Sequence, residues 1–151
     1  MQQLKNVLEL MKIGEKLKME MRHSWLSNGR RESVAEHTWS TSLLAMAIAP
    51  YLPQKVNMEK LLKMVIIHDL VEAYARDIPA FYTMDDEAMR ALKLQNETEA
   101  IEKVRDLLGD ENGQQFYDLW FEFENKETYE GKVVTALDKL EAQRKKKTNY
   151  A

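Results

Sequence analysis

Two polar residues interrupt one of the most apolar stretches of this 151-residue chain. His68 and Asp69 lie within the otherwise largely apolar run 64–71, Asp138 interrupts a second apolar run, and His37 precedes a third. A polar side chain that is buried without a partner destabilises the fold. An ionised Asp in the middle of a core helix therefore needs either a cation or several hydrogen-bond donors.

Two imidazoles and two carboxylates form a ligand set of two nitrogens and two oxygens, which suits Mn, Fe, Co, Zn or Mg. A metal that prefers more ligands than these would keep positions open for water and a substrate oxygen, as catalytic metal sites do. Each residue alone also has a structural explanation, since a buried His can be satisfied within the core and a buried Asp can pair with an Arg or a helix N-terminus. From the residues alone, both interpretations stay open.

Two further acidic residues follow the His-Asp pair. Glu72 comes four residues after His68, which predicts a place on the same helix face one turn on. Asp77 lies just past the predicted helix end, where Pro79 turns the chain. Such carboxylates could position or deprotonate an attacking water and protonate a leaving oxygen. The structural alternative is that these carboxylates do not touch the metal and form a salt bridge around its ligands, for instance to Arg76.

The elements that must position these residues are predicted to be helices. Apolar residues recur at helical spacing, and only 5 Gly and 3 Pro interrupt the chain. We predict an all-α fold, a single-domain bundle of about six helices over residues 1–151 with the metal site between helices. We expect no sheet, and residues 22–33, with the turn signal Ser27-Asn28-Gly29, are predicted to form a loop.

The predicted helices have recognisable ends. The first helix carries the apolar stripe Leu4, Val7, Leu8 and Met11, which Leu17 could extend, and the second begins near Val34, after a capping box of Ser33 and Glu36. The third helix is capped by Asn57 and ends before Asp77, and the fourth runs from about Asp85 to Leu108 and is closed by Gly109. The fifth helix covers residues 112–125, and the last begins near Glu130. Five aromatic residues of the fifth helix fit either the interior or a homodimer surface equally well: Phe116, Tyr117, Trp120, Phe121 and Phe123.

Composition excludes several classes of protein. The chain has no Cys, which excludes disulfides, thiolate zinc sites and cysteine nucleophiles. Its formal net charge of −3 disfavours binding to duplex nucleic acid. No apolar run approaches the roughly 20 residues of a membrane span, and the first residues lack the apolar segment of a signal peptide. We therefore expect a cytoplasmic protein with no membrane partner.

The order His37, His68-Asp69, Asp138 is similar to the H…HD…D signature of the HD-domain metal-dependent phosphohydrolases. Three longer strings resemble the branch of the bacterial 5′-deoxynucleotidase and its relatives: RHSWLSNGRRESVAEHTW (22–39), IHDLVEAYARDIPAF (67–81) and ALDKLEAQ (136–143). The likeness covers nearly the whole chain. Relatives continue beyond the last string, so we expect residues 1–151 to form a single HD domain that lacks their C-terminal segment.

The resemblance implies a small-molecule nucleotide substrate and one divalent ion. The implied metal ligands are His37, His68, Asp69 and Asp138; the implied catalytic residues are Glu72 and Asp77; and the implied substrate-binding residues are Arg22 and Trp25. The implied reaction removes the 5′-phosphate from (deoxy)nucleoside monophosphates. A planar indole suits a base or sugar, and a guanidinium suits a phosphate. Arg22 and Trp25 could otherwise be a surface cation and a loop anchor.

Two other hypotheses concern the same fold. A non-catalytic HD-fold module for nucleotide binding or protein interaction would not require Glu72 and Asp77. A di-iron oxygenase would need additional His ligands, and His23 is the one histidine left over.

Overall fold

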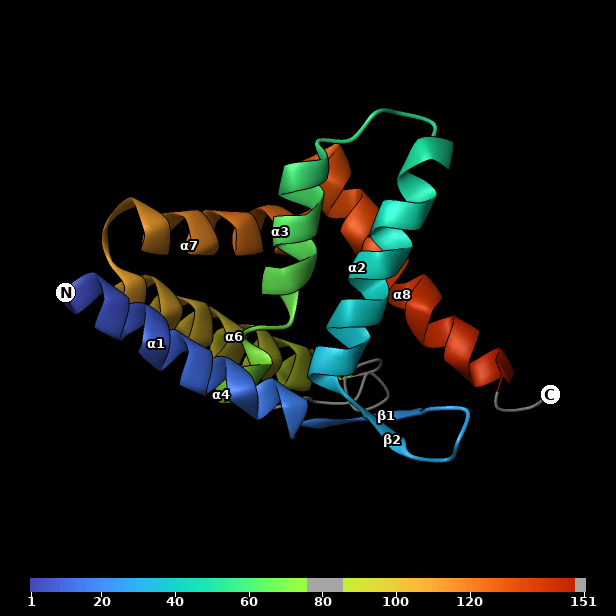
Figure 1. The fold of residues 1–151 in the computed structure, drawn as a ribbon, viewed down its shortest axis with the longest axis horizontal. Coiled ribbons are helices and arrows are strands. Elements are labelled where there is room, and N and C mark those ends of the chain that lie inside the picture. Colours follow the sequence, from blue (N-terminus) through green and yellow to red (C-terminus); the bar gives the residue numbers. More distant parts are fainter. Residues whose placement is uncertain (76–85, 149–151) are drawn as a thin grey trace.

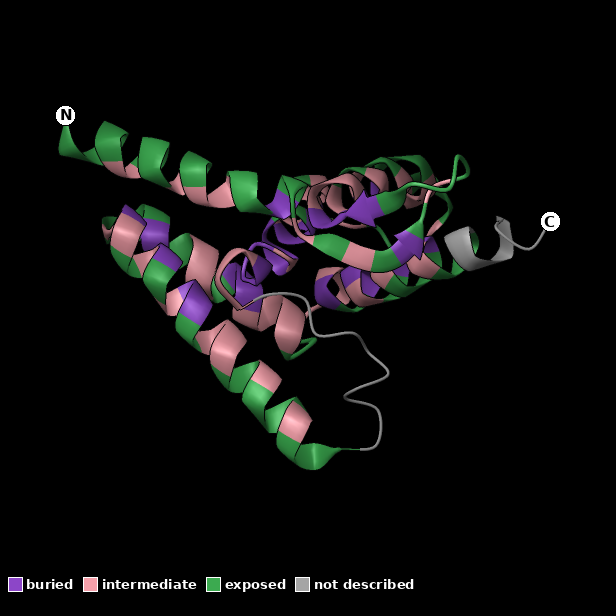
Figure 2. Cartoon of the chain, turned by 90° about the horizontal axis from the view of Figure 1, so that it is seen from below, coloured by how far each residue is buried: buried purple, intermediate pink, exposed green. Residues whose placement is uncertain are grey.

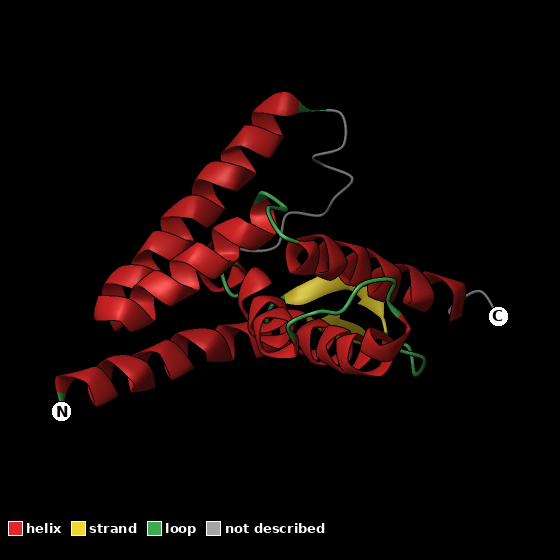
Figure 3. Ribbon diagram, turned by 90° about the horizontal axis from the view of Figure 1, so that it is seen from above, coloured by secondary structure: helices red, strands yellow, loops and turns green. Residues whose placement is uncertain are grey.

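The computed structural model describes residues 1–75 and 86–148, and in these ranges the chain forms a helical bundle with one small hairpin (Figures 1 and 3). The α-helices are α1 (Gln2–Glu15), α2 (Val34–Ile48), α3 (Met58–His68), α4 (Glu72–Ala75), α6 (Glu87–Leu108), α7 (Asp110–Glu124) and α8 (Tyr129–Thr148); two 3₁₀ helices are Lys16–Lys18 and Ala49–Tyr51; the strands are β1 (Met21–Trp25) and β2 (Arg31–Ser33). The predicted all-α fold is confirmed, apart from the hairpin.

Helix α3 lies at the centre of the bundle and packs against α2, α7 and α8 (Figure 1). Its apolar residues Leu61, Met64 and Val65 are fully buried, as expected for a helix that is apolar nearly all round. Figure 2 shows this buried core where α3 passes between its neighbours. Helices α6 and α7 form a packed pair beside it, and α1 runs along α6.

The predicted helix ends are confirmed where they rest on capping motifs. Ser33 Oγ accepts a hydrogen bond from the Glu36 backbone N–H, and the Glu36 carboxylate accepts one from the Ser33 N–H, so the capping box forms. The Asn57 side chain caps α3 through the Lys60 N–H. Gly109 closes α6 at φ 69°, a conformation that favours glycine. None of the helices in the described ranges is long and apolar enough to cross a membrane.

The prediction of a loop over residues 22–33 was wrong, because β1 and β2 pair there as an antiparallel hairpin. The turn itself was correct: the Leu26 N–H donates to the Arg30 carbonyl and Gly29 takes φ 84°. The sequence pattern did not predict the strands because they are short and because their buried positions hold the polar residues Ser24 and Glu32 instead of alternating apolar ones.

The predicted first helix is present as α1, but most of its apolar stripe lies outside the core. Four of its residues are exposed in α1: Leu4, Val7, Leu8 and Met11. Only Leu17, just beyond the helix, is buried. By contrast, the aromatic residues of α7 belong to the interior, since Trp120 is fully buried and the other four pack partly buried against the core.

Candidate metal centre

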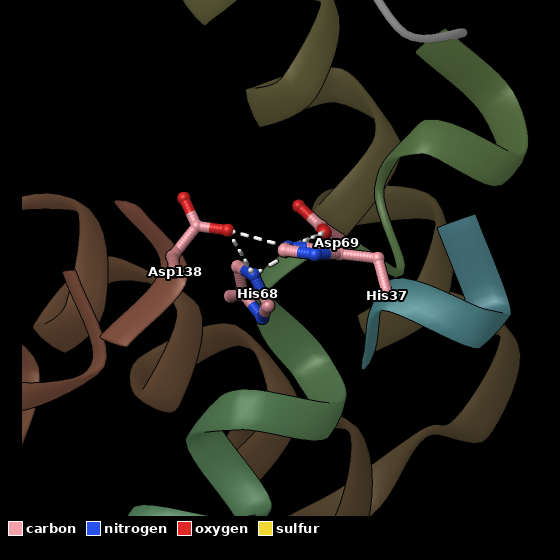
Figure 4. A group of neighbouring side chains, drawn as sticks. All are labelled: His37, His68, Asp69 and Asp138. Atoms are coloured by element: carbon pink, nitrogen blue, oxygen red, sulfur yellow. Dashed lines mark hydrogen bonds and ion pairs between the residues drawn. The ribbon is translucent and has the colours of Figure 1, made fainter. Parts of the chain in front are cut away.

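Four side chains from three separate parts of the chain converge between α2, α3 and α8 (Figure 4). His37 comes from the second turn of α2, His68 and Asp69 from the end of α3, and Asp138 from the middle of α8. One nitrogen or oxygen of each lies within 4.8 Å of those of the other three. We call this group the four-residue cluster. The sequence analysis predicted the same four residues as metal ligands, and the fold brings them together.

The two imidazoles present the same ring atom to the cluster. His37 Nε2 lies 2.6 Å from Asp138 Oδ1 and 3.7 Å from Asp69 Oδ2. His68 Nε2 lies 3.2 Å from Asp69 Oδ2 and 3.5 Å from Asp138 Oδ1. The His68 ring is held from two sides, by a hydrogen bond from Nδ1 to the Val65 carbonyl and by an edge-to-face contact with Phe123 at 5.3 Å.

The electrostatics of the cluster favour positive charge at its centre. Burial lowers the pKa of His68, but the charges of Asp69 and Asp138 outweigh it and raise that pKa well above its ordinary value. Burial raises the pKa of Asp138, but contacts with His37 and His68 outweigh it and lower that pKa far below the usual range. A cation can supply the positive charge in place of protons on the imidazoles.

The donor set fits a divalent metal ion by an independent criterion. Within the described part of the chain, His68 Nε2 and Asp69 Oδ2 are buried polar atoms that form no hydrogen bond of good geometry, although they lie 3.2 Å from each other. Buried polar atoms are normally satisfied, so two such atoms aimed at one point need an explanation. One divalent ion held by the four-residue cluster would give both atoms a partner.

Arg22 is the cation closest to the cluster among those with described contacts. Its Nη1 lies 3.9 Å from Asp69 Oδ2 and its Nε lies 3.8 Å from Glu32 Oε2. The side chain is largely buried, and β1 carries it toward the end of α3. Trp25, at the far end of the same strand, is 44% exposed. The hairpin missed from the sequence is therefore the element that positions both predicted substrate-binding residues.

Glu72 lies elsewhere than the sequence predicted. Helix α3 ends at His68, Asp69 is its C-terminal cap, and α4 begins only at Glu72, so His68 and Glu72 do not share one helix face. Backbone N–H groups in this segment, such as those of Leu70 and Glu72, donate to carbonyls three residues back, a 3₁₀-type spacing that turns the side chains out of α-helical register. Glu72 is buried and lines a cavity of about 420 Å³ with Lys16, Met19, Glu20, Ala73 and Tyr74. Asp77 lies outside the described residues.

Three carboxylates around the site were not predicted. Glu141 Oε2 lies 2.6 Å from His37 Nδ1, and Glu32 is buried between Arg22 and His37. Glu97 on α6 is largely buried, and burial together with the charges of Glu124 and Asp69 raises its pKa to about 7 against the lowering effect of Lys93. The one signal for Glu141 was its place three residues after Asp138, about one turn along the same helix.

The chain matches the family model described as HD domain over residues 14–150. It is 34% identical over 139 residues to 5′-deoxynucleotidase HDDC2 of Danio rerio, an alignment that covers 90% of this chain and 66% of that protein. It is 31% identical over 145 residues to 5′-deoxynucleotidase HDDC2 of Dictyostelium discoideum, covering 91% and 74% respectively. The zebrafish comparison thus spans just under two thirds of that relative's length.

A solved structure also resembles this chain. The crystal structure of a predicted metal-dependent phosphohydrolase from Magnetospirillum magnetotacticum superposes with a TM-score of 0.80 and 30% sequence identity, over 93% of this chain and 70% of that one.

Proposed function

The chain belongs to the HD domain family, and on that premise we propose that it is a metal-dependent phosphohydrolase that removes the 5′-phosphate from deoxynucleoside monophosphates. The observation that carries the proposal is the four-residue cluster, with two buried ligand atoms that form no hydrogen bond of good geometry among the described residues. The names of the relatives from Danio rerio and Dictyostelium discoideum support the choice of substrate.

The four-residue cluster would hold one divalent ion through His37 Nε2, His68 Nε2 and a carboxylate oxygen each of Asp69 and Asp138. When bound, such an ion polarises a phosphate oxygen and lowers the pKa of a coordinated water. Because the donor set is intermediate in hardness, Mn, Co, Fe, Zn and Mg all fit, and the identity of the metal is a matter for titration.

The remaining roles belong to residues around the cluster. Arg22 would bind the phosphate and neutralise its charge, since it approaches Asp69 from the hairpin side. Trp25 would contact the base or sugar with its exposed indole. We assign the transfer of a proton between water and the leaving oxygen to Glu72 and Asp77 from the sequence alone.

Phosphate release tests the proposal directly. Metal-free protein would be reloaded with Mn²⁺ or Co²⁺ and incubated with a panel of deoxy- and ribonucleoside 5′-monophosphates. We expect inorganic phosphate to be released from the deoxynucleotides, at least 100-fold more slowly by Glu72→Gln. Glu20→Gln, which alters a second carboxylate lining the same cavity, is the matched control and should keep activity.

Metal binding and turnover would be measured on the same samples. If the protein binds Co²⁺ and a nucleotide but releases no phosphate from any substrate, it is a binding module rather than an enzyme, and the proposal fails.

The proposal also includes a homodimer in the cytoplasm. Large apolar side chains are exposed at helical spacing on α2, namely Trp39, Leu43 and Met46, and Leu140 is exposed on α8, which packs against α2. Contiguous exposed apolar surface is typical of interaction sites. Light scattering of the purified protein would measure the mass of the particle directly.

A further inference from the structure

The two ring nitrogens of His37 face different carboxylates. Nε2 lies 2.6 Å from Asp138 Oδ1, inside the four-residue cluster, whereas Nδ1 lies 2.6 Å from Glu141 Oε2, on the opposite side of the ring. Glu141 is only 1% exposed, and His37 is fully buried. A carboxylate enclosed to this degree is costly unless it has a specific partner, and here the partner is the imidazole.

The second histidine shows what this contact does. His68 Nδ1 bonds to the Val65 carbonyl, which can only accept a hydrogen bond, so in the neutral, metal-binding form of the ring Nδ1 carries the hydrogen and Nε2 keeps a lone pair toward the cluster. An ionised Glu141 also can only accept, and it therefore imposes the same tautomer on His37. One imidazole is fixed by a backbone carbonyl and the other by a side chain, which can be replaced by mutation.

Glu141 is itself held in place. It lies three residues after Asp138 on α8, so both carboxylates project from nearly the same face of that helix toward His37. Arg144 Nη2 lies 3.6 Å from Glu141 Oε1 and offsets part of the buried negative charge. Helix α8 thus approaches the His37 ring at both nitrogens, through two residues one turn apart.

We propose that Glu141 is a positioning residue: by accepting a hydrogen bond from His37 Nδ1 it presents His37 Nε2, with its lone pair, to the divalent ion of the four-residue cluster. This inference rests on the proposed metal site. Partners of this kind commonly contribute 10- to 100-fold to metal affinity, and we expect Glu141→Ala to weaken Co²⁺ binding by about that factor.

Three proteins would be titrated with Co²⁺ and followed by its visible absorption: wild type, Glu141→Ala and Glu141→Gln. The Gln amide oxygen can still accept from Nδ1, so we expect Glu141→Gln to bind within a few-fold of wild type while Glu141→Ala does not. Glu130→Ala is the matched control, since Glu130 also accepts a hydrogen bond on α8, from the Asn57 N–H, at the other end of the helix. Its affinity should equal that of wild type.

A second readout reports on the tautomer without activity. In the Zn²⁺-loaded wild type, the long-range ¹H–¹⁵N spectrum should show His37 protonated at Nδ1 and not at Nε2. The proposal is overturned if Glu141→Ala binds Co²⁺ as tightly as wild type, or if Glu141→Gln loses as much affinity as Glu141→Ala. It is also overturned if wild type binds two Co²⁺ ions and Glu141→Ala one, because Glu141 would then be a ligand, in a site with Glu32 and His37. A wild type that binds no metal would instead refute the proposed function.

Discussion

Arg22 Nη1 lies 3.9 Å from Asp69 Oδ2, so a guanidinium from the hairpin stands beside a carboxylate at the end of the central helix. The separation exceeds that of a close hydrogen-bonded ion pair, which is about 2.7–2.9 Å. The guanidinium is therefore not saturated by Asp69 and retains donors for an incoming anion. This position supports the proposed role of Arg22, which is to bind a phosphate that contacts the four-residue cluster.

Replacement of Arg22 tests this placement. We expect Arg22→Ala to lower kcat/KM for deoxynucleoside monophosphates by about 100- to 1,000-fold, because a charge that stabilises the phosphate is lost. Arg30→Ala is the control, since Arg30 belongs to the same hairpin but pairs with the exposed Glu36. Steady-state kinetics measure both variants. If Arg22→Ala and Arg30→Ala lower kcat/KM equally, the hairpin affects activity only through its fold, and the proposed role of Arg22 is contradicted.

Glu97 makes stability depend on pH. Burial raises its pKa in the folded protein from 4.5 to about 7, against the opposing effect of Lys93, with further increases from Glu124 and Asp69. The folded state therefore holds a proton that the unfolded state releases at lower pH. Its favourable contribution is fully present below pH 4.5 and is lost as the pH rises to about 7.

We expect Glu97→Gln to remove this dependence. Above pH 7 the metal-free variant should be more stable than wild type, by on the order of 1 to 3 kcal/mol, since one pKa unit corresponds to about 1.4 kcal/mol. Urea unfolding between pH 4 and 8, in the presence of a chelator, gives the free energy of unfolding of both proteins as a function of pH. Parallel curves for the two proteins would mean that Glu97 does not titrate in this range.

Gly113 lies where α7 comes very close to the backbone of α6. A Cβ at this position would lie 2.2 Å from the Arg105 carbonyl oxygen, which is backbone and cannot move aside freely. We expect Gly113→Ala to destabilise the protein by about 1 to 3 kcal/mol, as overpacked sites do.

Gly14, in α1, is the matched control because nothing lies within 4 Å of its added Cβ. Gly14→Ala should stabilise the protein by about 0.5 to 1 kcal/mol through better helix propensity. Urea midpoints compare the two variants, and similar effects in both would contradict the packing argument.

The parts of the fold that follow from local rules were predictable. Ser33 with Glu36 and the cap at Asn57 act on their own neighbours in the chain, and the structure has them as expected. His68 and Asp69 stood out because polar residues in an apolar run need partners. The sequence identified the members of the cluster without giving their geometry.

The remaining features depend on contacts between distant segments. The buried positions of β1 and β2 include the polar residues Ser24 and Glu32. The sequence therefore shows no alternation of apolar residues that would predict the pairing of these strands. No Gly or Pro marks the break between His68 and Glu72, and only the backbone hydrogen bonds reveal it. Glu141 resembles any helical Glu until α8 is placed against α2.

His37 and Asp138 are in contact although 101 positions separate them in the chain. A growing polypeptide on the ribosome consequently cannot complete the ligand set until α8 has been synthesised and has docked on α2 and α3. Capture of an ion by all four proposed ligands would thus be a late step in the maturation of the protein. Fragments that end before α8 would offer at most three of the ligands.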